Sequence, residues 1–447
     1  MTPDPRHLWG HFSRISTPHT PVMVRGDGCY VWDSKGNRVI DGLSGLFCVQ
    51  VGHGRKELAA AAAAQMEKLA FFPIWSYGNE PAMALAERLA HLAPPGLDRV
   101  FFTDSGSAAV ESAWKLARQY HSIQGDHGRS KVISRTYTYH GTSMGALALT
   151  GIPAVRAPFE PLVPGAIKIQ NTNHYRCHDC SHLDGCTLRC ADDLALRIEM
   201  EGPETIAAVF LEPLQNTGGA LVPPPGYFEH VREICDRYGI LLVADEVICA
   251  FGRLGEWFGS TRYNCQPDMI TFAKGVTSGY APMGGLIVHE RVAEPFLAEG
   301  NTFLHGMTFA GHPMSCAVAL ANLDIIQDED LCGNVRRNQD LFTTLLDGLR
   351  DIPIVGDVRG AGYFRAIELV RNQATKETFN DDDCEWILRK TLSPRLYELG
   401  LYCRADDRAD PVLVLSPPLI AGADELHEIV RIVRIALQEA AEAFARR

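Results

Sequence analysis

Short apolar segments alternate with helix-forming segments through the middle of this chain, and this alternation constrains the fold more than any other feature. Segments that are apolar throughout, rather than at every second position, suit strands buried on both faces of a parallel sheet. The expected strands are 99–103, 131–134, 206–211, 240–244, 269–272 and 285–288, and the expected helices include 108–124, 193–201 and 227–238. The pattern predicts an α/β fold with a mostly parallel central sheet flanked by helices.

The pattern changes near Asp330, where a long helix is followed by more widely separated strands. We expect a small α+β domain here, completed by the N-terminal segment. The predicted division is a large domain over 61–329, a discontinuous small domain over 1–60 and 330–447, and a cysteine-rich loop insertion over 171–192.

The chain is acidic, with 42 Lys and Arg residues against 54 Asp and Glu residues and a net charge of −12. A surface of this sign argues against nucleic acid or an anionic membrane as a partner. The apolar runs are far shorter than the roughly 20 residues that a membrane span needs. The N-terminus lacks the apolar core of a signal peptide, so we expect a cytoplasmic enzyme.

Polar residues follow directly after three of the expected strands, and ligands bind at the carboxyl ends of strands in open α/β sheets. Ser105, Gly106 and Ser107 come between a strand and a helix. Free backbone N–H groups and hydroxyls at a helix start form a site suited to a phosphate. The alternative is that Ser105 or Ser107 only caps the helix.

Asp245 and Lys274 follow two further strands and face the same crevice in the predicted sheet. A buried carboxylate needs a positive partner or strong hydrogen-bond donors, so one alternative is that these two side chains simply pair. A phosphate site, a buried aspartate and a crevice lysine are also the fixtures of a pyridoxal-phosphate site. There the lysine forms a Schiff base and the aspartate keeps the ring nitrogen protonated.

Ordered motifs along nearly the whole chain make this second interpretation specific. They are DGLSGL at 41–46, VGHG at 51–54, DSGS at 104–107, YHG at 139–141, EPLQ at 212–215, DEV at 245–247, GR at 252–253, AKG at 273–275, HGMTF at 305–309 and SPP at 416–418. In these motifs the chain resembles the class III (omega-amino acid) aminotransferases, which are fold-type I pyridoxal-phosphate enzymes. The resemblance implies that fold, the cofactor pyridoxal 5′-phosphate and transfer of an amino group.

The resemblance also implies roles for individual residues. Lys274 and Asp245 would be catalytic, Tyr139 and Val247 would lie on the two faces of the ring, and Gln215 would bind the ring hydroxyl. The full implied cofactor set is Ser105, Gly106, Ser107, Tyr139, His140, Glu212, Gln215, Asp245, Val247, Lys274 and Thr308. Thr308 would reach the phosphate of a neighbouring subunit, which implies a homodimer with shared active sites, or a tetramer of such dimers.

The resemblance extends to the substrates. In pyruvate-using relatives a mobile arginine binds the substrate carboxylate, and the matching position is Arg404, with Arg408 as a rival. Phe47, Trp75 and Tyr139 would line the pocket. We expect pyruvate as amino acceptor and an omega-amino acid or amine, such as beta-alanine, taurine or a diamine, as donor. The alternative is a non-transaminating enzyme on the same scaffold: a mutase, decarboxylase or racemase.

Four of the thirteen cysteines fall within fourteen residues: Cys177, Cys180, Cys186 and Cys190. Four thiolates so close in sequence suit structural zinc or an iron–sulfur cluster. An iron–sulfur cluster would make the enzyme redox-responsive. Two loop disulfides or four free thiols are the alternatives, and the spacing does not separate these possibilities.

Overall fold

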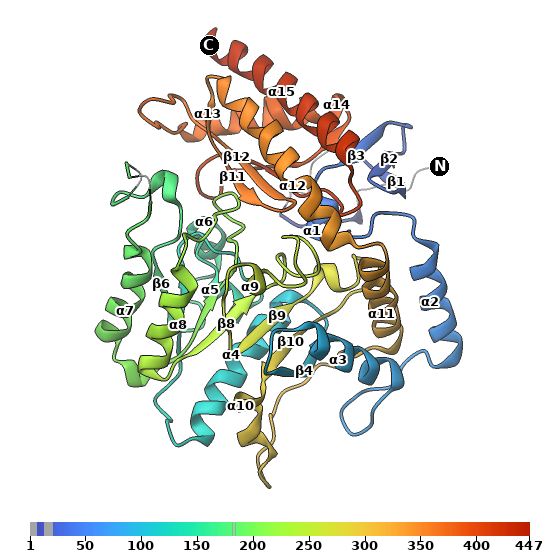
Figure 1. Cartoon of the computed structure of the whole chain (residues 1–447), viewed down its shortest axis with the longest axis vertical. Coiled ribbons are helices and arrows are strands. Elements are labelled where there is room, and N and C mark those ends of the chain that lie inside the picture. The colour runs from blue at the N-terminus through green and yellow to red at the C-terminus, as the bar shows by residue number, and fades with distance from the viewer. Residues whose placement is uncertain (1–6, 13–20, 181, 184) are drawn as a thin grey trace.

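The computed structural model describes residues 7–12, 21–180, 182–183 and 185–447 of the chain (Figure 1). Its centre is a seven-stranded sheet. In sheet order the strands are β4 (Leu97–Thr103), β10 (Gly284–His289), β9 (Met269–Phe272), β8 (Leu241–Asp245), β7 (Ile206–Leu211), β5 (Lys131–Arg135) and β6 (Ala166–Ile169). Only β10 runs against its neighbours. The predicted α/β class with a mostly parallel sheet is confirmed.

Successive side chains of the central strands point to opposite faces of the sheet and join different parts of the core. Val243 packs in one cluster with residues of α4 (Gly106–Ile123), whereas Leu242 and Ala244 belong to the cluster that contains α7 (Arg189–Glu201) and α8 (Tyr227–Tyr238). Helices therefore cover both faces, which is why the strands are apolar throughout. Polar side chains therefore gather at the ends of the strands.

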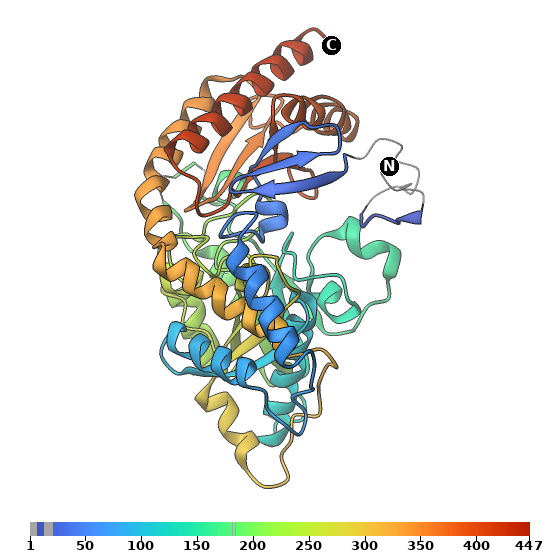
Figure 2. The same ribbon diagram turned by 90° about the vertical axis from the view of Figure 1, so that its right-hand side faces the viewer.

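Two smaller sheets lie above the central one in Figure 1. One has the order β1 (Met23–Asp27), β2 (Tyr30–Asp33), β3 (Arg38–Asp41), β13 (Leu401–Tyr402), and the other β11 (Val355–Ala361), β12 (Phe364–Leu369), β15 (Val412–Leu415), β14 (Arg404–Asp406). The pairing of β3 with β13 joins the two ends of the chain. The long helices α12 (Leu331–Asp347) and α15 (Ala423–Ala445) contact each other on the outer side of these sheets (Figure 2).

The remaining helices complete the layers and the connections. They are α1 (Ser44–Phe47), α2 (Lys56–Lys68), α3 (Glu80–Leu92), α5 (Met144–Leu149), α6 (Pro153–Arg156), η2 (Ala157–Phe159), η3 (His174–Arg176), η4 (Pro203–Thr205), α9 (Gly259–Arg262), η5 (Lys274–Val276), α10 (Glu290–Ala293), η6 (Glu294–Leu297), α11 (Pro313–Asp328), η7 (Gly348–Asp351), α13 (Asp381–Cys384), η8 (Glu385–Leu392) and α14 (Ser393–Glu398). Within the described ranges, no helix has the length and apolar character needed to span a bilayer.

The cysteine-rich loop between β6 and α7 reaches the neighbouring small sheet. Arg176 Nε lies 2.6 Å from the buried Glu368 on β12 and 3.6 Å from Asp410. Lys376 donates a hydrogen bond to the Tyr175 carbonyl oxygen at 3.1 Å, and its ammonium group lies over the Tyr175 ring. The loop is thus tied to β12, to the segment after β12 and, through Asp410, to the segment that follows β14.

Candidate active site

The carboxyl ends of β4, β8 and β9 meet at a cavity of about 160 Å³. Its lining includes nine of the residues implied by the sequence motifs: Ser105, Gly106, Ser107, Tyr139, His140, Glu212, Asp245, Val247 and Lys274. Gly141, Ile248, Cys249 and Ala273 complete the wall. Residues up to 169 positions apart in the sequence converge here because parallel strands end at the same edge of the sheet.

One end of the cavity is the N-terminus of α4, an eighteen-residue helix. Ser105 is its N-cap, with Oγ accepting a hydrogen bond from the Ala108 N–H at 3.3 Å. Gly106 is the first helical residue, and a Cβ there would lie 3.1 Å from Val247 Cγ1. The absence of a side chain lets the backbone approach the cavity closely. Unpaired N–H groups at the positive pole of a helix bind anions.

Asp245 ends β8 and is held by three donors. Its Oδ1 accepts hydrogen bonds from Thr271 Oγ1 at 3.0 Å and from the Val247 N–H at 3.1 Å, and its Oδ2 lies 2.6 Å from His140 Nδ1. Thr271 is the cross-strand partner of Asp245 on β9. These contacts fix the carboxylate, and they replace the simple Asp245–Lys274 pair considered from the sequence.

His140 is itself positioned by a buried chain of polar groups. Its Nε2 lies 3.1 Å from Thr138 Oγ1, and that hydroxyl donates to Glu212 Oε1. The other oxygen of Glu212 accepts from the Asn216 N–H at 2.9 Å. Burial raises the pKa of Glu212, an effect opposed by the nearby His140 and Arg135. Thr138 and Thr271 are functional residues that the sequence motifs did not reveal.

Lys274 follows β9 and begins η5 with φ of 44°, a left-handed conformation that non-glycine residues rarely adopt. Such strain persists where the surrounding structure fixes it, and it is frequent at functional sites. The side chain lines the same cavity as Ser105, Gly106 and Ser107, and burial lowers its pKa. A lysine with a lowered pKa is more readily neutral, the form in which an amine acts as nucleophile or base.

A second cavity, of about 630 Å³, adjoins the first. Tyr139, Ile248 and Lys274 line both. Its charged wall comes from β14 and the segment after it, and carries Arg404 and Arg408. Arg408 lies over the Tyr139 ring at 5.6 Å from the ring centroid. Lys274 therefore lines both cavities. The first has the N-terminus of α4 and the buried Asp245 carboxylate, and the second has guanidinium groups.

Comparison with known proteins gives this arrangement a family. The family model described as "Aminotransferase class-III" matches residues 12–437. The chain belongs to the class III aminotransferases. It is 54% identical over 435 residues to a probable aminotransferase of Mycobacterium tuberculosis, covering 97% of this chain and 93% of that protein. It is 36% identical over 434 residues to the putrescine–pyruvate aminotransferase of Pseudomonas aeruginosa, with 97% and 93% covered.

A solved structure agrees with this assignment. The (S)-enantioselective omega-transaminase of Thermomicrobium roseum superposes with a TM-score of 0.91 at 40% identity, covering 97% of this chain and 96% of that one. The fold-type I expectation is thereby confirmed. Pyridoxal 5′-phosphate is the cofactor of class III aminotransferases.

The first cavity of this aminotransferase fits that cofactor on its own geometry. The α4 N-terminus offers donors for a phosphate, and the fixed carboxylate of Asp245 offers an acceptor for a protonated ring nitrogen. Tyr139 and Val247 line the cavity, and Lys274 reaches it with a lowered pKa. Bound there, the cofactor supplies an electron sink for bonds at the substrate carbon.

Three residues that the sequence resemblance assigns to cofactor or substrate binding lie outside both cavities. Gln215 is buried, and its amide nitrogen donates to the Thr136 and Thr217 carbonyl oxygens at 2.9 and 3.1 Å. Its carboxamide oxygen has no hydrogen-bond partner. Thr308 is exposed, as is Trp75, whose indole nitrogen donates to the Met307 carbonyl oxygen at 3.4 Å. Phe47, in contrast, is buried and lines the second cavity.

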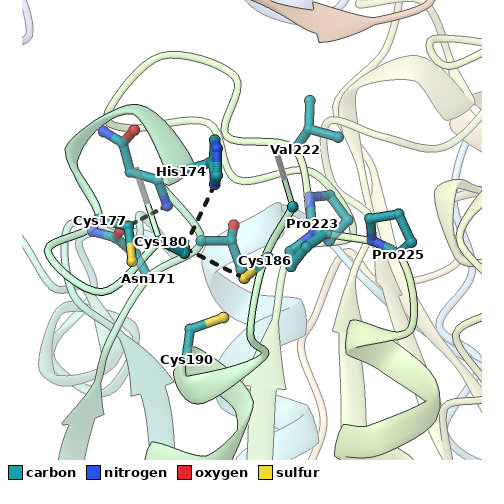
Figure 3. Close-up of a pocket in the computed structure, with 13 residues that line it drawn as sticks. Asn171, His174, Cys177, Cys180, Cys186, Cys190, Val222, Pro223 and Pro225 are labelled. Atoms are coloured by element: carbon teal, nitrogen blue, oxygen red, sulfur yellow. Dashed lines mark hydrogen bonds between the residues drawn. The ribbon is translucent and has the colours of Figure 1, made fainter. Parts of the chain in front are cut away.

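The four clustered cysteines line a separate cavity beside Val222 and Pro223 (Figure 3). Cys180 Sγ lies 3.7 Å from Cys186 Sγ and 3.5 Å from His174 Nδ1, and burial raises the pKa of Cys180 to about 12. All four thiols are free, so the loop-disulfide alternative is not seen. Within the described part of the chain, no three His, Cys, Asp or Glu side chains are gathered as metal ligands. The expected zinc or iron–sulfur site is thus not preformed, and the family match does not support it.

Proposed function

We propose that this aminotransferase moves an amino group from an omega-amino acid or amine to pyruvate by a ping-pong mechanism, with donors such as beta-alanine, taurine or a diamine. The observation that carries the proposal is the junction of two cavities at Lys274 and Tyr139. One suits a phosphorylated cofactor and the other presents guanidinium groups to a carboxylate. The name of the Pseudomonas relative, putrescine–pyruvate aminotransferase, supports the same substrate pair.

In this mechanism Lys274 moves a proton at the substrate carbon, because it is the base at the meeting point of the two cavities. Asp245 holds a proton on the ring nitrogen, with His140, Thr271 and the Val247 N–H fixing its carboxylate. The residues 105–107 bind the phosphate. Gln215 does not line the cavity, so its buried, unpartnered oxygen would have to turn toward the cofactor to accept a hydrogen bond from the ring hydroxyl.

Arg404 or Arg408 binds the carboxylate of the keto acid in this proposal. A planar guanidinium group gives a carboxylate two parallel hydrogen bonds. Arg404 comes from β14, and burial lowers its pKa, whereas Arg408 lies over the Tyr139 ring. Separate Arg404→Ala and Arg408→Ala variants distinguish them, because the variant that removes the binding group raises KM for pyruvate and leaves KM for a carboxyl-free amine unchanged.

Half-reactions test the proposed substrates. The holoenzyme is mixed with each amine in turn, and conversion of the cofactor is followed by its visible absorbance. Pyruvate should then restore the original spectrum and yield alanine. A pyridoxamine form discharged by 2-oxoglutarate and not by pyruvate would refute the acceptor, and product formation without any acceptor would favour a mutase, decarboxylase or racemase.

We also propose a homodimer, with the two-domain division expected from the sequence. The loops that carry Trp75 and Thr308 form an exposed apolar surface, where Phe71 and Phe309 stack edge to face at 5.7 Å. Contiguous exposed aromatic side chains mark interaction surfaces. Trp75→Asp should shift the mass in light scattering from dimer to monomer, and an unchanged mass would contradict the proposed interface. Location in the cytoplasm remains our proposal.

The cysteine cluster favours a second role, and we propose that it takes up a single thiolate-bound zinc ion. In a tetrahedral site with Zn–S bonds of about 2.3 Å, sulfur atoms lie about 3.8 Å apart, and the Cys180 and Cys186 sulfurs are 3.7 Å apart. The Leu188 N–H donates to Cys186 Sγ at 3.4 Å, which would stabilise a thiolate. Cys177 and Cys190 would have to turn toward this pair.

Metal analysis of anaerobically purified protein tests the zinc proposal. We expect one zinc per chain, which Cys180→Ser should lose and the control Cys384→Ser should retain, because Cys384 lies in α13 and bonds to the Phe379 carbonyl oxygen. Detection of iron together with acid-labile sulfide would show that the cysteines hold an iron–sulfur cluster and not a single zinc ion. Absence of both metals would end the proposal and leave four free thiols.

A further inference from the structure

A single buried carboxylate lies between the two arginines of the substrate cavity. Asp406 ends β14, and its side chain is 7% exposed. Its Oδ1 and Oδ2 lie 2.9 and 3.1 Å from Arg408 Nε, and Oδ2 lies 2.6 Å from Arg408 Nη2. Oδ2 is also 3.3 Å from Arg404 Nε. Asp406 therefore makes the kind of two-pronged contact that a substrate carboxylate would make.

The other carboxylate in the wall of this cavity is already paired. Asp407 also lines it, but its two oxygens are bound by Arg389 at 2.6 and 2.8 Å. Two guanidinium groups, Arg404 and Arg408, then share the one carboxylate of Asp406, which leaves these three side chains with one net positive charge. That charge attracts an anionic substrate, and a buried guanidinium without a partner is costly.

The proposed reaction makes opposing demands on this cavity. The keto acid brings a carboxylate that needs a guanidinium partner. A carboxyl-free amine brings none, so it would leave an arginine uncompensated in a cavity from which it displaces water. A carboxylate of the protein that binds the arginine in one half-reaction and releases it in the other satisfies both demands.

We propose that Asp406 is this internal counter-carboxylate: a positioning residue that pairs with Arg408 and Arg404 when a carboxyl-free amine is bound, and yields a guanidinium to the carboxylate of the keto acid. This inference rests on the proposed function and deepens it. Asp406 lines the second cavity and not the first, and it acts through the arginines. Asp406 would thus set the relative affinity of the cavity for substrates with a carboxylate and for substrates without one.

The sign of the effect follows from competition. Asp406→Asn keeps the size and one acceptor oxygen but removes the charge. The arginine is then held less tightly, and keto acids should bind more tightly. Complexes with a carboxyl-free amine should form less readily, because the guanidinium loses its partner. Hydrogen bonds from an arginine to a carboxylate are stronger than those to a neutral amide. The difference should shift the ratio of kcat/KM for the keto acid to kcat/KM for the carboxyl-free amine by roughly tenfold.

The test measures each half-reaction separately on the holoenzyme by rapid mixing. For Asp406→Asn we expect half-saturation at about tenfold less pyruvate with little change in the rate at saturation, and a lower kcat/KM for 1-phenylethylamine. Asp268→Asn is the matched control, since Asp268 is another buried carboxylate paired with two arginines, Arg232 and Arg291, and it lines neither cavity. Its ratio of specificities should equal that of the wild type.

A second readout separates this inference from the proposed function. Propionate, an unreactive carboxylate, is titrated into the holoenzyme by calorimetry, and the Asp406→Asn variant should bind it more tightly whichever substrates the enzyme turns over. Weaker or unchanged propionate binding in Asp406→Asn would overturn the role of Asp406. Failure of pyruvate as acceptor, with tighter propionate binding retained, would overturn only the proposed acceptor.

Discussion

Replacement of His140 by phenylalanine should weaken cofactor binding without unfolding the site. The change removes the 2.6 Å contact between His140 Nδ1 and Asp245 Oδ2, while Thr271 Oγ1 and the Val247 N–H still hold Oδ1. A hydrogen bond to a charged group contributes about 1.5–3 kcal/mol. If that amount is lost from the cofactor complex, the dissociation constant rises about 10- to 150-fold, at 1.4 kcal/mol per tenfold.

The assay is a titration of apoenzyme with pyridoxal 5′-phosphate, followed by visible absorbance. His121→Phe is the matched control, because His121 is another buried histidine whose Nε2 pairs with the Ala207 carbonyl oxygen at 2.9 Å, away from the cavity. It should lose stability and keep its cofactor affinity. Equal cofactor affinity in His140→Phe and the wild type would refute the claim that His140 positions Asp245.

Two buried ionisable groups give predictions about stability and pH. Burial lowers the pKa of Lys168 to about 7 from the ordinary 10.5. Between these two pH values the unfolded chain therefore binds more protons than the folded chain. Relative to Lys168→Met, the free energy of unfolding should rise by about 2 kcal/mol from pH 7 to 9. Burial raises the pKa of Glu246 to about 7, so here the folded chain holds the extra proton. Relative to Glu246→Gln, stability should fall by about 2 kcal/mol from pH 5 to 7. Urea denaturation at each pH measures both, and parallel pH profiles of wild type and variant would contradict the assignment concerned.

The catalytic candidates could be predicted from the sequence because their positions follow from local rules. Lys274 and Asp245 come directly after apolar strands, and strands of this type end together at one edge of a sheet. Thr271 could not be found this way. It supports Asp245 only because β8 and β9 are neighbours, and the order of strands in a sheet is not written in any local pattern.

Burial of the substrate wall could not be predicted from the sequence for a related reason. The charged segment around Arg404 looks solvated in the sequence, yet Asp406 is buried because β14 pairs with β15 at Val412. Charged residues become buried here by pairing with one another. Whether they do so depends on the tertiary contact and not on the local composition.

The segment 381–398 shows how local and longer-range effects combine. It consists of α13, the π-helical η8 and then α14, with Pro394 in the first turn of α14. Proline has no N–H to donate to the preceding turn. The Ser393 hydroxyl donates to the Leu388 carbonyl oxygen at 2.7 Å instead, so the helix continues through a wider turn and does not end there.

The central claim is that Lys274 and its two cavities transfer nitrogen from an amine to pyruvate, and isotope transfer tests it most directly. The holoenzyme is loaded with a ¹⁵N-labelled amine, freed of excess donor and mixed with pyruvate. We expect the label in alanine in a single turnover, and none in alanine from Lys274→Ala. Label released as ammonia, or transfer that survives the loss of Lys274, would contradict the account.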